Sequence, residues 1–430
     1  MYHRNICCEC LILQYNYLFQ FIKKFNISTM NTTFKPADLM QDNQHFGEFG
    51  GVNPSISDSA TYTFLHAQTM MDTFEGKQGG CYLYSRHSSP SNLYLCEALA
   101  AMEGTEDANV TGSGMGAITT TILQICGAGD HIVSARTIYG GTYAFLKNFI
   151  PKLNIKTSFV DITSLAKVEA AIQPNTKMLY CEVMSNPLLE IANVPELAKI
   201  AKKHNIPLVV DNTFSPLIMS PFQMGADVVI HSLTKFINGM NDTVGGVVCA
   251  SKDFINATKS VNDGAAMLLG PTMDSFRSSS VLKNTHTLPV RMKKHSENAM
   301  YISERLEKDG ARIVYPGLKS HKDHELFKSM YNAEFGFGGM ITIDAGTLEK
   351  ADAFMEMMQD RKLGYLAVSL GFYKTLFNAP GTGTSSEVPL DEQVEMGLTQ
   401  GLVRFSMGLD NNIERTYQGI KQCMIETGIL

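Results

Sequence analysis

The sequence predicts an α/β protein with a large domain around a mainly parallel sheet, followed by a smaller α+β domain at the C-terminal end. Its 430 residues exceed what one hydrophobic core usually serves, which favours two domains. Between about residues 108 and 250, short apolar runs alternate with segments of helical spacing. Beyond about residue 310, strand-like and helix-like segments follow each other without that regular alternation.

The large domain is expected to contain a series of parallel strands connected by helices. The apolar runs are HIVSA (131–135), KTSFVDI (156–162), MLYCEVM (178–184), PLVVDN (207–212) and DVVIHS (227–232). Segments of helical spacing, such as VPELAKIAKKH (194–204), separate them. Because parallel strands need crossover connections, helices should cover both faces, and ligands should bind at the carboxyl ends of the strands.

The C-terminal domain is expected to follow a long amphipathic helix, LPVRMKKHSENAMYISERLEKDG (288–310), which links it to the large domain. Strand-like runs then occur at ARIVYP (311–316), GGMITIDAG (338–346) and GLVRFSMGL (401–409), with a helix at LEKADAFMEMMQDRK (348–362). The predicted division is an N-terminal extension at 1–29, an arm contacting a neighbouring subunit at 30–88, the large α/β domain at 89–290 and the C-terminal α+β domain at 291–430.

The N-terminal extension is aromatic and cysteine-rich, and we expect it to be dispensable for the fold, with Met30 as an alternative start. Four residues interrupt its apolar run before the length of about 20 residues that a spanning helix needs: Tyr17, Gln20, Lys23 and Lys24. A signal peptide fits poorly because no small-residue cleavage site follows a clean apolar core. No metal site is expected at its three cysteines, since no second pair of ligands follows at zinc-finger spacing: Cys7, Cys8 and Cys10.

The charge and cysteine content exclude several classes of protein. The formal net charge is −6 and the pI is near 6.0, with no basic cluster to pair with phosphates, so neither a nucleic acid nor a membrane is an expected partner. The odd total of nine cysteines, without a repeated spacing, favours reduced thiols in a cytoplasmic protein over a disulfide framework. The expected ligand is a small molecule.

Two neighbouring strands of the predicted sheet deliver an acid and an amine to its carboxyl edge. PLVVD ends on Asp211, and the strand DVVIHS is followed by Lys235 in HSLTKFINGM. A lysine near a carboxylate is usually only an ion pair. Here, however, Ser232 and Thr234 accompany the lysine, and their hydroxyls are able to hydrogen-bond an anionic group held beside the amine.

A second signal for anion binding lies upstream, in NVTGSGMGAITTTILQICGAGDHIV (109–133), where a short strand leads through glycines into a helix. Backbone amides at a helix start form a phosphate seat when no side chains block them, as at Gly112, Gly114 and Gly116. The segment also matches a dinucleotide fingerprint loosely. A dinucleotide site would need an acid closing the next strand, and HIVSA closes instead on Arg136.

A phosphate seat, a lysine and a strand-ending carboxylate are together what pyridoxal phosphate requires, since the amine bonds its aldehyde and the acid keeps its ring nitrogen protonated. With YSRHSSPS, SGMGA, TIYGGT, EVMSNP, VDNTFSP and HSLTKFINGM in this order, the chain resembles the Cys/Met metabolism family of pyridoxal-phosphate enzymes, which includes cystathionine γ-synthase and methionine γ-lyase. The resemblance runs from about Phe46 to the C-terminus. It implies the transferase fold of aspartate aminotransferase (fold type I), with a seven-stranded sheet in the large domain.

The resemblance also implies which residues hold the cofactor. Lys235 would be the residue bonded to the cofactor and the catalytic base, and Asp211 would face the pyridine nitrogen. Four residues would hold the phosphate by hydroxyl groups or backbone amides: Ser232, Thr234, Gly114 and Met115.

Further residues are implied at the cofactor ring, the substrate and the subunit interface. Tyr139 would stack on the ring and serve as the catalytic acid for the leaving group, and Asn186 would lie beside the ring oxygen and the substrate. Tyr84 and Arg86 would reach the phosphate of a neighbouring subunit, which implies active sites shared within a homotetramer built from two dimers. Two residues would bind the substrate, the first through a planar fork suited to its α-carboxylate: Arg404 and Ser369.

The implied activity is that of a carbon–sulfur lyase of sulfur amino-acid metabolism. Val368 stands before Ser369, where family members acting on cystathionine frequently have glutamate, and this favours α,γ-elimination of L-methionine as in methionine γ-lyase. Two departures point elsewhere, because Gly141 and Asn262 stand where methionine γ-lyases typically have cysteine and lysine. The alternatives are γ-replacement on an activated homoserine, as in cystathionine γ-synthase or O-acetylhomoserine sulfhydrylase, and a cystathionine lyase of the transsulfuration type.

Two hypotheses from other classes stay open at this point. An NAD-dependent oxidoreductase would use the glycine loop but would leave Lys235 and Asp211 unexplained. A catalytically silent binding protein on the same fold is the second. The histidine-containing segment SHKDHEL (320–326) is expected to be a solvated polar patch and not a metal site.

Overall fold

The computed structural model describes residues 34–381 and 389–430. The predicted extension at 1–29, with its cysteines, and Met30 lie outside the described residues. Within the described part of the chain, no helix is long and apolar enough to cross a membrane.

The larger part of the molecule is built on a seven-stranded sheet in the order β1-β7-β6-β5-β4-β2-β3. Its strands are β1 (Asp107–Thr111), β2 (His131–Ala135), β3 (Lys156–Val160), β4 (Thr176–Glu182), β5 (Leu208–Asp211), β6 (Val228–Ser232) and β7 (Gly246–Ala250). Neighbouring strands are parallel except at β7, which runs antiparallel to both β1 and β6. The predicted α/β class with a mainly parallel sheet is therefore confirmed, although β7 has no counterpart among the strands predicted above.

Helices cover both faces of this sheet. They are α4 (Pro90–Glu103), α5 (Gly114–Ile125), α6 (Gly140–Ala144), α7 (Leu165–Ala170), α8 (Val194–Lys203), α9 (Lys252–Thr258), α10 (Ala265–Leu269) and α11 (Ser275–Thr285), with short helical turns at Phe145–Phe149, Ile150–Leu153 and Pro221–Met224. On β6, Ser232 meets Gly114 of α5, whereas the preceding residue, His231, contacts Glu103 of α4. Because successive strand side chains point to opposite faces, α4 and α5 lie on opposite sides of the sheet.

The helix α8 shows why these segments fold as the sequence pattern predicts. Its N-cap residue, Asn193, accepts a hydrogen bond from the backbone N–H of Glu196, which satisfies one of the unpaired amides at the helix start. Two lysines in the last turn complement the helix dipole. Its buried residues recur three and four positions apart and face the core: Val194, Leu197 and Ala201.

A second sheet of five strands, in the order β10-β11-β12-β9-β8, organises the C-terminal part of the chain. Its strands are β8 (Ile313–Val314), β9 (Met340–Asp344), β10 (Tyr365–Leu366), β11 (Leu376–Asn378) and β12 (Leu402–Ser406). The accompanying helices are α12 (Leu288–Lys308), α13 (His324–Met330), α14 (Leu348–Asp360), α15 (Leu390–Met396) and α16 (Ile413–Glu426), with a short turn at Ala333–Phe335. A hydrophobic core separate from that of the large sheet fills this part, which confirms a C-terminal domain: Ile302, Phe354, Phe405 and Ile420 are among its members.

One segment predicted to be solvated is partly buried. His324 begins α13 and is 8% exposed, its Nδ1–H donates to the Pro316 carbonyl at 2.8 Å, and its ring stacks on Phe337. The prediction of a solvated patch is therefore wrong for this histidine, because its ring is part of an aromatic cluster and not of a polar loop.

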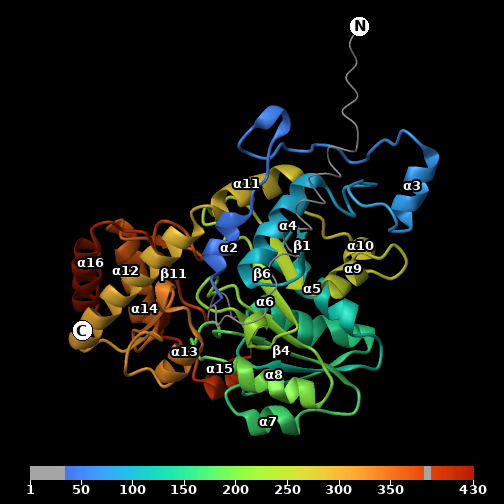
Figure 1. The fold of residues 1–430 in the computed structure, drawn as a ribbon. Helices are drawn as coiled ribbons and strands as arrows, with labels where there is room; N and C mark the ends of the chain where they lie inside the picture. The colour runs from blue at the N-terminus through green and yellow to red at the C-terminus, as the bar shows by residue number, and fades with distance from the viewer. Residues whose placement is uncertain (1–33, 382–388) are drawn as a thin grey trace.

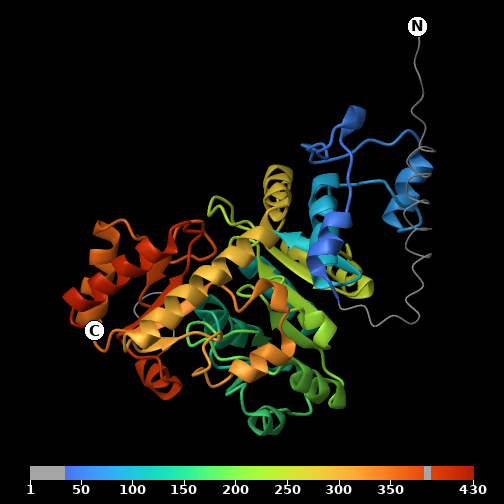
Figure 2. The same ribbon diagram turned by 60° about the vertical axis from the view of Figure 1, so that its left-hand side comes forward.

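The long helix α12 runs between the C-terminal domain and the rest of the molecule, while the N-terminal arm extends away at the opposite end (Figures 1 and 2). In the described part of the arm, from residue 34 on, the helices are α2 (Pro36–Asp42) and α3 (Ala67–Phe74), with a short turn at Glu48–Gly50. Several large apolar side chains of the arm are exposed in the single chain: Phe46, Phe49, Val52, Leu65 and Phe74. Such a surface is typical of a protein–protein contact.

The first turn of α12 is tied to the segment that follows β6. Arg291 is 6% exposed, and its guanidinium donates to the carbonyls of Phe236, of Ile237 at 2.8 Å and of Asn284 at 3.0 Å. Gly239 has a φ of +72°, and a Cβ on it would lie 2.3 Å from Nη1 of Arg291. A glycine is therefore required here both by the backbone conformation and by the close approach of the guanidinium.

The Arg291 contacts predict a specific loss of stability. Arg291→Met should lower the free energy of unfolding by about 3 kcal/mol, because the buried carbonyls of Phe236, Ile237 and Asn284 lose a charged donor. Arg277→Met is the matched control, since the side chain of Arg277 is 55% exposed and pairs with Asp274, and it should change stability by about 0.5 kcal/mol or less. Urea unfolding of the three proteins measures the difference, and equal midpoints for both variants would contradict the prediction.

Candidate active site

A cavity of about 240 Å³ lies at the carboxyl edge of the seven-stranded sheet. Its lining comes from the ends of β4, β5 and β6, from the start of α5, and from the C-terminal domain. Of the residues predicted above, those that line it are Gly114, Met115, Tyr139, Asn186, Asp211, Ser232, Thr234, Lys235 and Arg404. The structure thus brings together side chains that are up to 290 positions apart in the chain, from Gly114 to Arg404.

One end of the cavity is formed by the start of α5 and the end of β6. The N-cap residue Ser113 accepts a hydrogen bond from the amide of Gly116 at 2.9 Å, while the first amides of a helix have no intrahelical acceptor. A Cβ on Gly114 would lie 2.8 Å from the Cβ of Ser232, so only glycine permits this approach of helix and strand. The amides of Gly114 and Met115 and the hydroxyl of Ser232 are therefore suited to bind an anion together. We call these three groups the anion seat.

Thr234 has a different set of contacts. Its hydroxyl accepts from the amide of Gly245 at 3.1 Å and lies 3.3 Å from the carbonyl of the same residue. This hydroxyl therefore fixes the turn between β6 and β7 as well as lining the cavity.

Lys235 lies between the anion seat and the C-terminal domain. Its Nζ donates to the Ser369 hydroxyl at 3.2 Å, which places Ser369 at the lysine although it is not part of the cavity wall. Burial, and secondarily the charge of Arg404, lower the pKa of Lys235 to about 8. A much larger fraction of this amine is therefore neutral near pH 8 than of an exposed lysine, and only the neutral amine is a nucleophile or a base.

Asp211 closes β5 on the wall of the cavity and is 8% exposed. Burial raises the pKa of Asp211, and this is opposed by hydrogen bonds from Thr213, whose amide donates to Oδ1 at 2.9 Å. The Thr213 hydroxyl in turn accepts from the amide of Ser232 at 2.8 Å, which joins the ends of β5 and β6. Among the described residues, no ion pair of Asp211 with a lysine or arginine is found, so this carboxyl on the cavity wall is suited to pair with a cation of a ligand.

A second buried carboxyl, Glu182, belongs to the site and is absent from the predicted set. It closes β4 directly beside Asp211 in the register of the sheet, is 8% exposed and lines the cavity. The signal was present in the sequence, because MLYCEVM reaches an acid at the strand end just as PLVVDN does.

Tyr139 is positioned by its backbone. Its amide donates to Oε1 of Glu182 at 2.7 Å, and its side chain lines the cavity while remaining 43% exposed. A Cβ on Gly141 would lie 2.6 Å from Cε1 of the Tyr139 ring. The observed ring position therefore depends on the absence of a side chain at residue 141.

Arg404 brings the C-terminal domain into the site. It lies on β12, is 3% exposed, and its Nη1 donates to the side-chain oxygen of Asn186 at 2.8 Å. Burial lowers the pKa of Arg404 to about 10, so the guanidinium is still charged at neutral pH. A buried guanidinium held by one neutral amide is suited to bind a carboxylate.

The remaining wall of the cavity is apolar. It is formed by Ile118, Met184, Phe214, Val244, Val368 and Leu370. Such a wall favours a hydrocarbon or thioether chain over a charged one.

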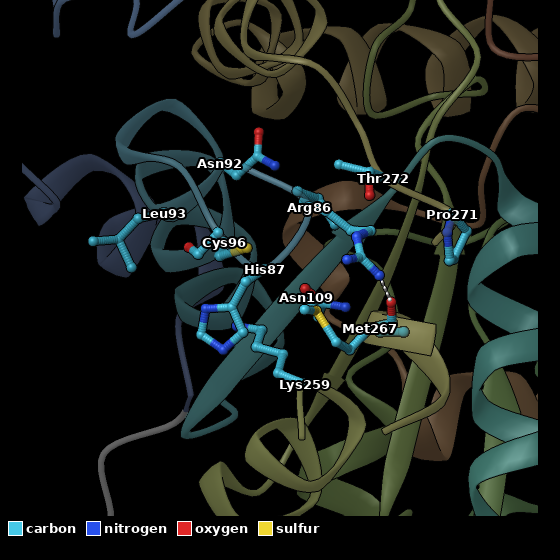
Figure 3. A pocket seen from close by; sticks show the side chains of 13 residues that line it. Arg86, His87, Asn92, Leu93, Cys96, Asn109, Lys259, Met267, Pro271 and Thr272 are labelled. Atoms are coloured by element: carbon cyan, nitrogen blue, oxygen red, sulfur yellow. Dashed lines mark hydrogen bonds between the residues drawn. The ribbon is translucent and has the colours of Figure 1, made fainter. Parts of the chain in front are cut away.

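Tyr84 and Arg86 do not reach this cavity. Arg86 donates to the Met267 carbonyl at 2.9 Å and lines a separate space of about 20 Å³ together with His87 and Lys259, as Figure 3 shows. The Tyr84 ring is 47% exposed, with the Arg86 guanidinium 5.7 Å from its centroid. Both residues thus face outward in the single chain.

The cavity fits pyridoxal phosphate on three observations. The anion seat at α5 suits a phosphate, the buried Asp211 forms no ion pair with a lysine or arginine among the described residues, and the amine of Lys235 lines the same cavity with a lowered pKa. The residues that would hold the cofactor are therefore Lys235, Asp211, Ser232 and the amides of Gly114 and Met115.

Comparison with known proteins confirms the family. The family model described as Cys/Met metabolism PLP-dependent enzyme matches residues 37–424. A methionine gamma-lyase of Arabidopsis thaliana is 42% identical over 397 residues, covering 91% of this chain and 90% of that protein. A cystathionine gamma-lyase of Bacillus subtilis (strain 168) is 39% identical, covering 77% of this chain and 85% of that protein.

The fold and cofactor are supported by a solved structure. A putative O-acetylhomoserine (thiol)-lyase of Campylobacter jejuni superimposes with a TM-score of 0.85 and 27% identity, covering 91% of this chain and 100% of that chain, and carries an N'-pyridoxyl-lysine-5'-monophosphate. The fold of the aspartate-aminotransferase type and the cofactor predicted above are thus confirmed. The chain belongs to the Cys/Met metabolism family of pyridoxal-phosphate-dependent enzymes.

Proposed function

We propose that the protein catalyses α,γ-elimination of L-methionine, converting methionine and water to 2-oxobutyrate, methanethiol and ammonia. The observation that carries this proposal is the apolar wall of the cavity, in which Val368 stands one residue before Ser369, the contact of Lys235. A thioether tail fits such a wall, whereas the distal ammonium of cystathionine would require a charged partner there. The 42% identical methionine gamma-lyase of Arabidopsis thaliana supports the same choice.

Each step needs a group that this chain supplies. Bound pyridoxal phosphate provides an electron sink for charge that develops on the substrate carbons. Arg404, with Asn186, binds the α-carboxylate, and the neutral amine of Lys235 removes the α proton and returns protons later in the reaction. Tyr139 donates a proton to the departing sulfur, and the cavity walls exclude water from these transfers.

A second candidate is γ-replacement on an activated homoserine. Gly141 favours it, since the Tyr139 ring lies so close that the cysteine typical of methionine γ-lyases would have to displace it. The likeness to the O-acetylhomoserine (thiol)-lyase of Campylobacter jejuni points the same way. The two candidates differ in one outcome, because a lyase releases methanethiol from methionine without an added thiol.

The proposal extends to assembly and location. The exposed apolar side chains of the arm, and the outward positions of Tyr84 and Arg86, support a homotetramer whose arms at 30–88 complete the sites of neighbouring subunits. The large domain at 89–290 and the C-terminal domain at 291–430 would each contribute to one site. The free state of every described cysteine supports a cytoplasmic location.

Removal of the lysine tests the proposed activity. Lys235→Ala should reduce release of 2-oxobutyrate and methanethiol from methionine by about 1000-fold or more, because both the cofactor bond and the base are lost. Borohydride reduction followed by peptide mass analysis should find a pyridoxyl label on Lys235 of the parent protein. Lys199→Ala, an exposed lysine of α8, should leave both measurements unchanged. A parent protein that releases no methanethiol from methionine would refute the elimination.

The lowered pKa of Lys235 predicts how cofactor attachment depends on pH. Below its pKa of about 8 the amine is protonated and inactive, so covalent attachment of pyridoxal phosphate to the apoprotein should accelerate about tenfold per pH unit and level off above pH 8. Borohydride quenching at timed intervals measures the label on Lys235. Arg404→Met should move the midpoint upward, because the neighbouring positive charge is removed. A midpoint near 10.4, as in exposed lysines, would contradict the prediction.

The apolar wall predicts a change of substrate preference. Val368→Glu should raise kcat/KM for cystathionine relative to methionine about tenfold, because a carboxylate gains the distal ammonium as partner and the thioether tail loses an apolar contact. Val290→Glu, at a site that is 70% exposed on α12, is the control and should leave the ratio unchanged. The ratio is measured by steady-state kinetics with both substrates, and an unchanged ratio in Val368→Glu would place residue 368 outside the specificity site.

A further inference from the structure

Glu182 is a buried carboxyl of the active site whose role is unexplained by the proposed reaction. It is 8% exposed, and among the described residues no ion pair of Glu182 with a lysine or arginine is found, although the charge of Arg404 acts on it. A buried carboxyl without an ion pair is costly and is retained only where its hydrogen bonds serve a purpose. Its contacts therefore indicate what that purpose is.

The Glu182 carboxyl joins two loops that leave the sheet at different strands. It accepts the amide of Tyr139 at 2.7 Å, and the amide of Asn186 also donates to it. Tyr139 follows β2, whereas Asn186 follows β4, and both of their side chains line the cavity. Asn186 in turn holds Arg404 through its side chain at 2.8 Å. The Glu182 carboxyl thus fixes the backbone of Tyr139, the proposed acid, and the backbone of Asn186, which orients Arg404.

The charge of the site is consistent with this structural role. Burial, and secondarily the neighbouring Asp211, raise the pKa of Glu182 well above its usual range. Two adjacent buried carboxyls resist ionising together. The hydrogen bonds from Thr213 lower the pKa of Asp211 against the effect of burial, so they favour the charged form of this carboxyl.

We propose that Glu182 is a positioning residue, which holds the Tyr139 and Asn186 loops so that both side chains face the cofactor and the substrate together. This inference rests on the proposed function, because the proton delivered by Tyr139 matters only where a poor leaving group departs. Methanethiolate needs such a proton, whereas acetate leaves without one. A loss of activity on methionine but not on O-acetylhomoserine therefore indicates that Tyr139 is misplaced. A similar loss on both substrates indicates general damage to the site.

The test compares Glu182→Gln, which keeps an acceptor oxygen of the same reach, with Glu182→Leu, which removes it. Glu182→Leu should lower kcat for methionine about 100-fold. Its kcat for elimination of acetate from O-acetylhomoserine should fall less than about tenfold. Glu182→Gln should stay within about threefold of the parent on both substrates. Glu97→Leu is the matched control, because Glu97 is a partly buried glutamate of α4 that does not line the cavity. Its kcat on both substrates should equal that of the parent.

Two measurements do not depend on turnover of methionine. Titration of the apoprotein with pyridoxal phosphate should show about tenfold weaker binding in Glu182→Leu and unchanged binding in Glu182→Gln, because the stacking ring is displaced only in the former. In a Tyr139→Phe background, Glu182→Leu should add little further loss of kcat, since both changes disable the same group. Should Glu182→Leu fail to fold, Glu182→Met replaces it in each comparison.

Some outcomes would overturn the inference. Equal losses on methionine and O-acetylhomoserine with unchanged cofactor affinity would show that Glu182 does not act through Tyr139, as would a full additional loss in the Tyr139→Phe background. A parent protein inactive on methionine would instead refute the proposed function, and the cofactor titration would still decide the role of Glu182.

Discussion

The carboxyl edge of the parallel sheet is the constraint on which the site depends. Parallel strands must all end at the same edge, so β4, β5 and β6 bring Glu182, Asp211 and Ser232 together whatever their separation in sequence. The start of α5 meets this edge because Gly114 allows the helix to approach Ser232. Lys235 follows the end of β6 by three residues and lines the same cavity.

Burial gives these groups the properties that their chemistry needs. The same exclusion of water lowers the pKa of Lys235 and raises those of Asp211 and Glu182. Two adjacent buried carboxyls are unfavourable when both are charged, and a positively charged ring would relieve this. The affinity of the site for its cofactor and the reactivity of its lysine therefore have one physical origin.

The sequence was sufficient to predict those parts of the fold and site that depend on local patterns. Alternating apolar runs and helical segments predicted the strands of the large sheet, and the hydroxyl and glycine motifs predicted Lys235, Asp211 and the anion seat. Glu182 could have been predicted by the same reasoning, and so could the strand β7 from its apolar run, but the antiparallel direction of β7 could not, since such a run does not reveal direction. Tyr84 and Arg86 do not line the cavity in the single chain, which the sequence motif does not reveal. The burial of His324 depends on an aromatic cluster formed only by folding.

The helix α12 connects the two ends of the active site without lining it. Its Arg291 donates to the carbonyls of the two residues that follow Lys235. One turn later, His295 donates through Nδ1 to the carbonyl of Met407, three residues beyond Arg404. The helix therefore helps to fix the separation between Lys235 and Arg404. This separation depends in part on a helical turn that does not line the cavity.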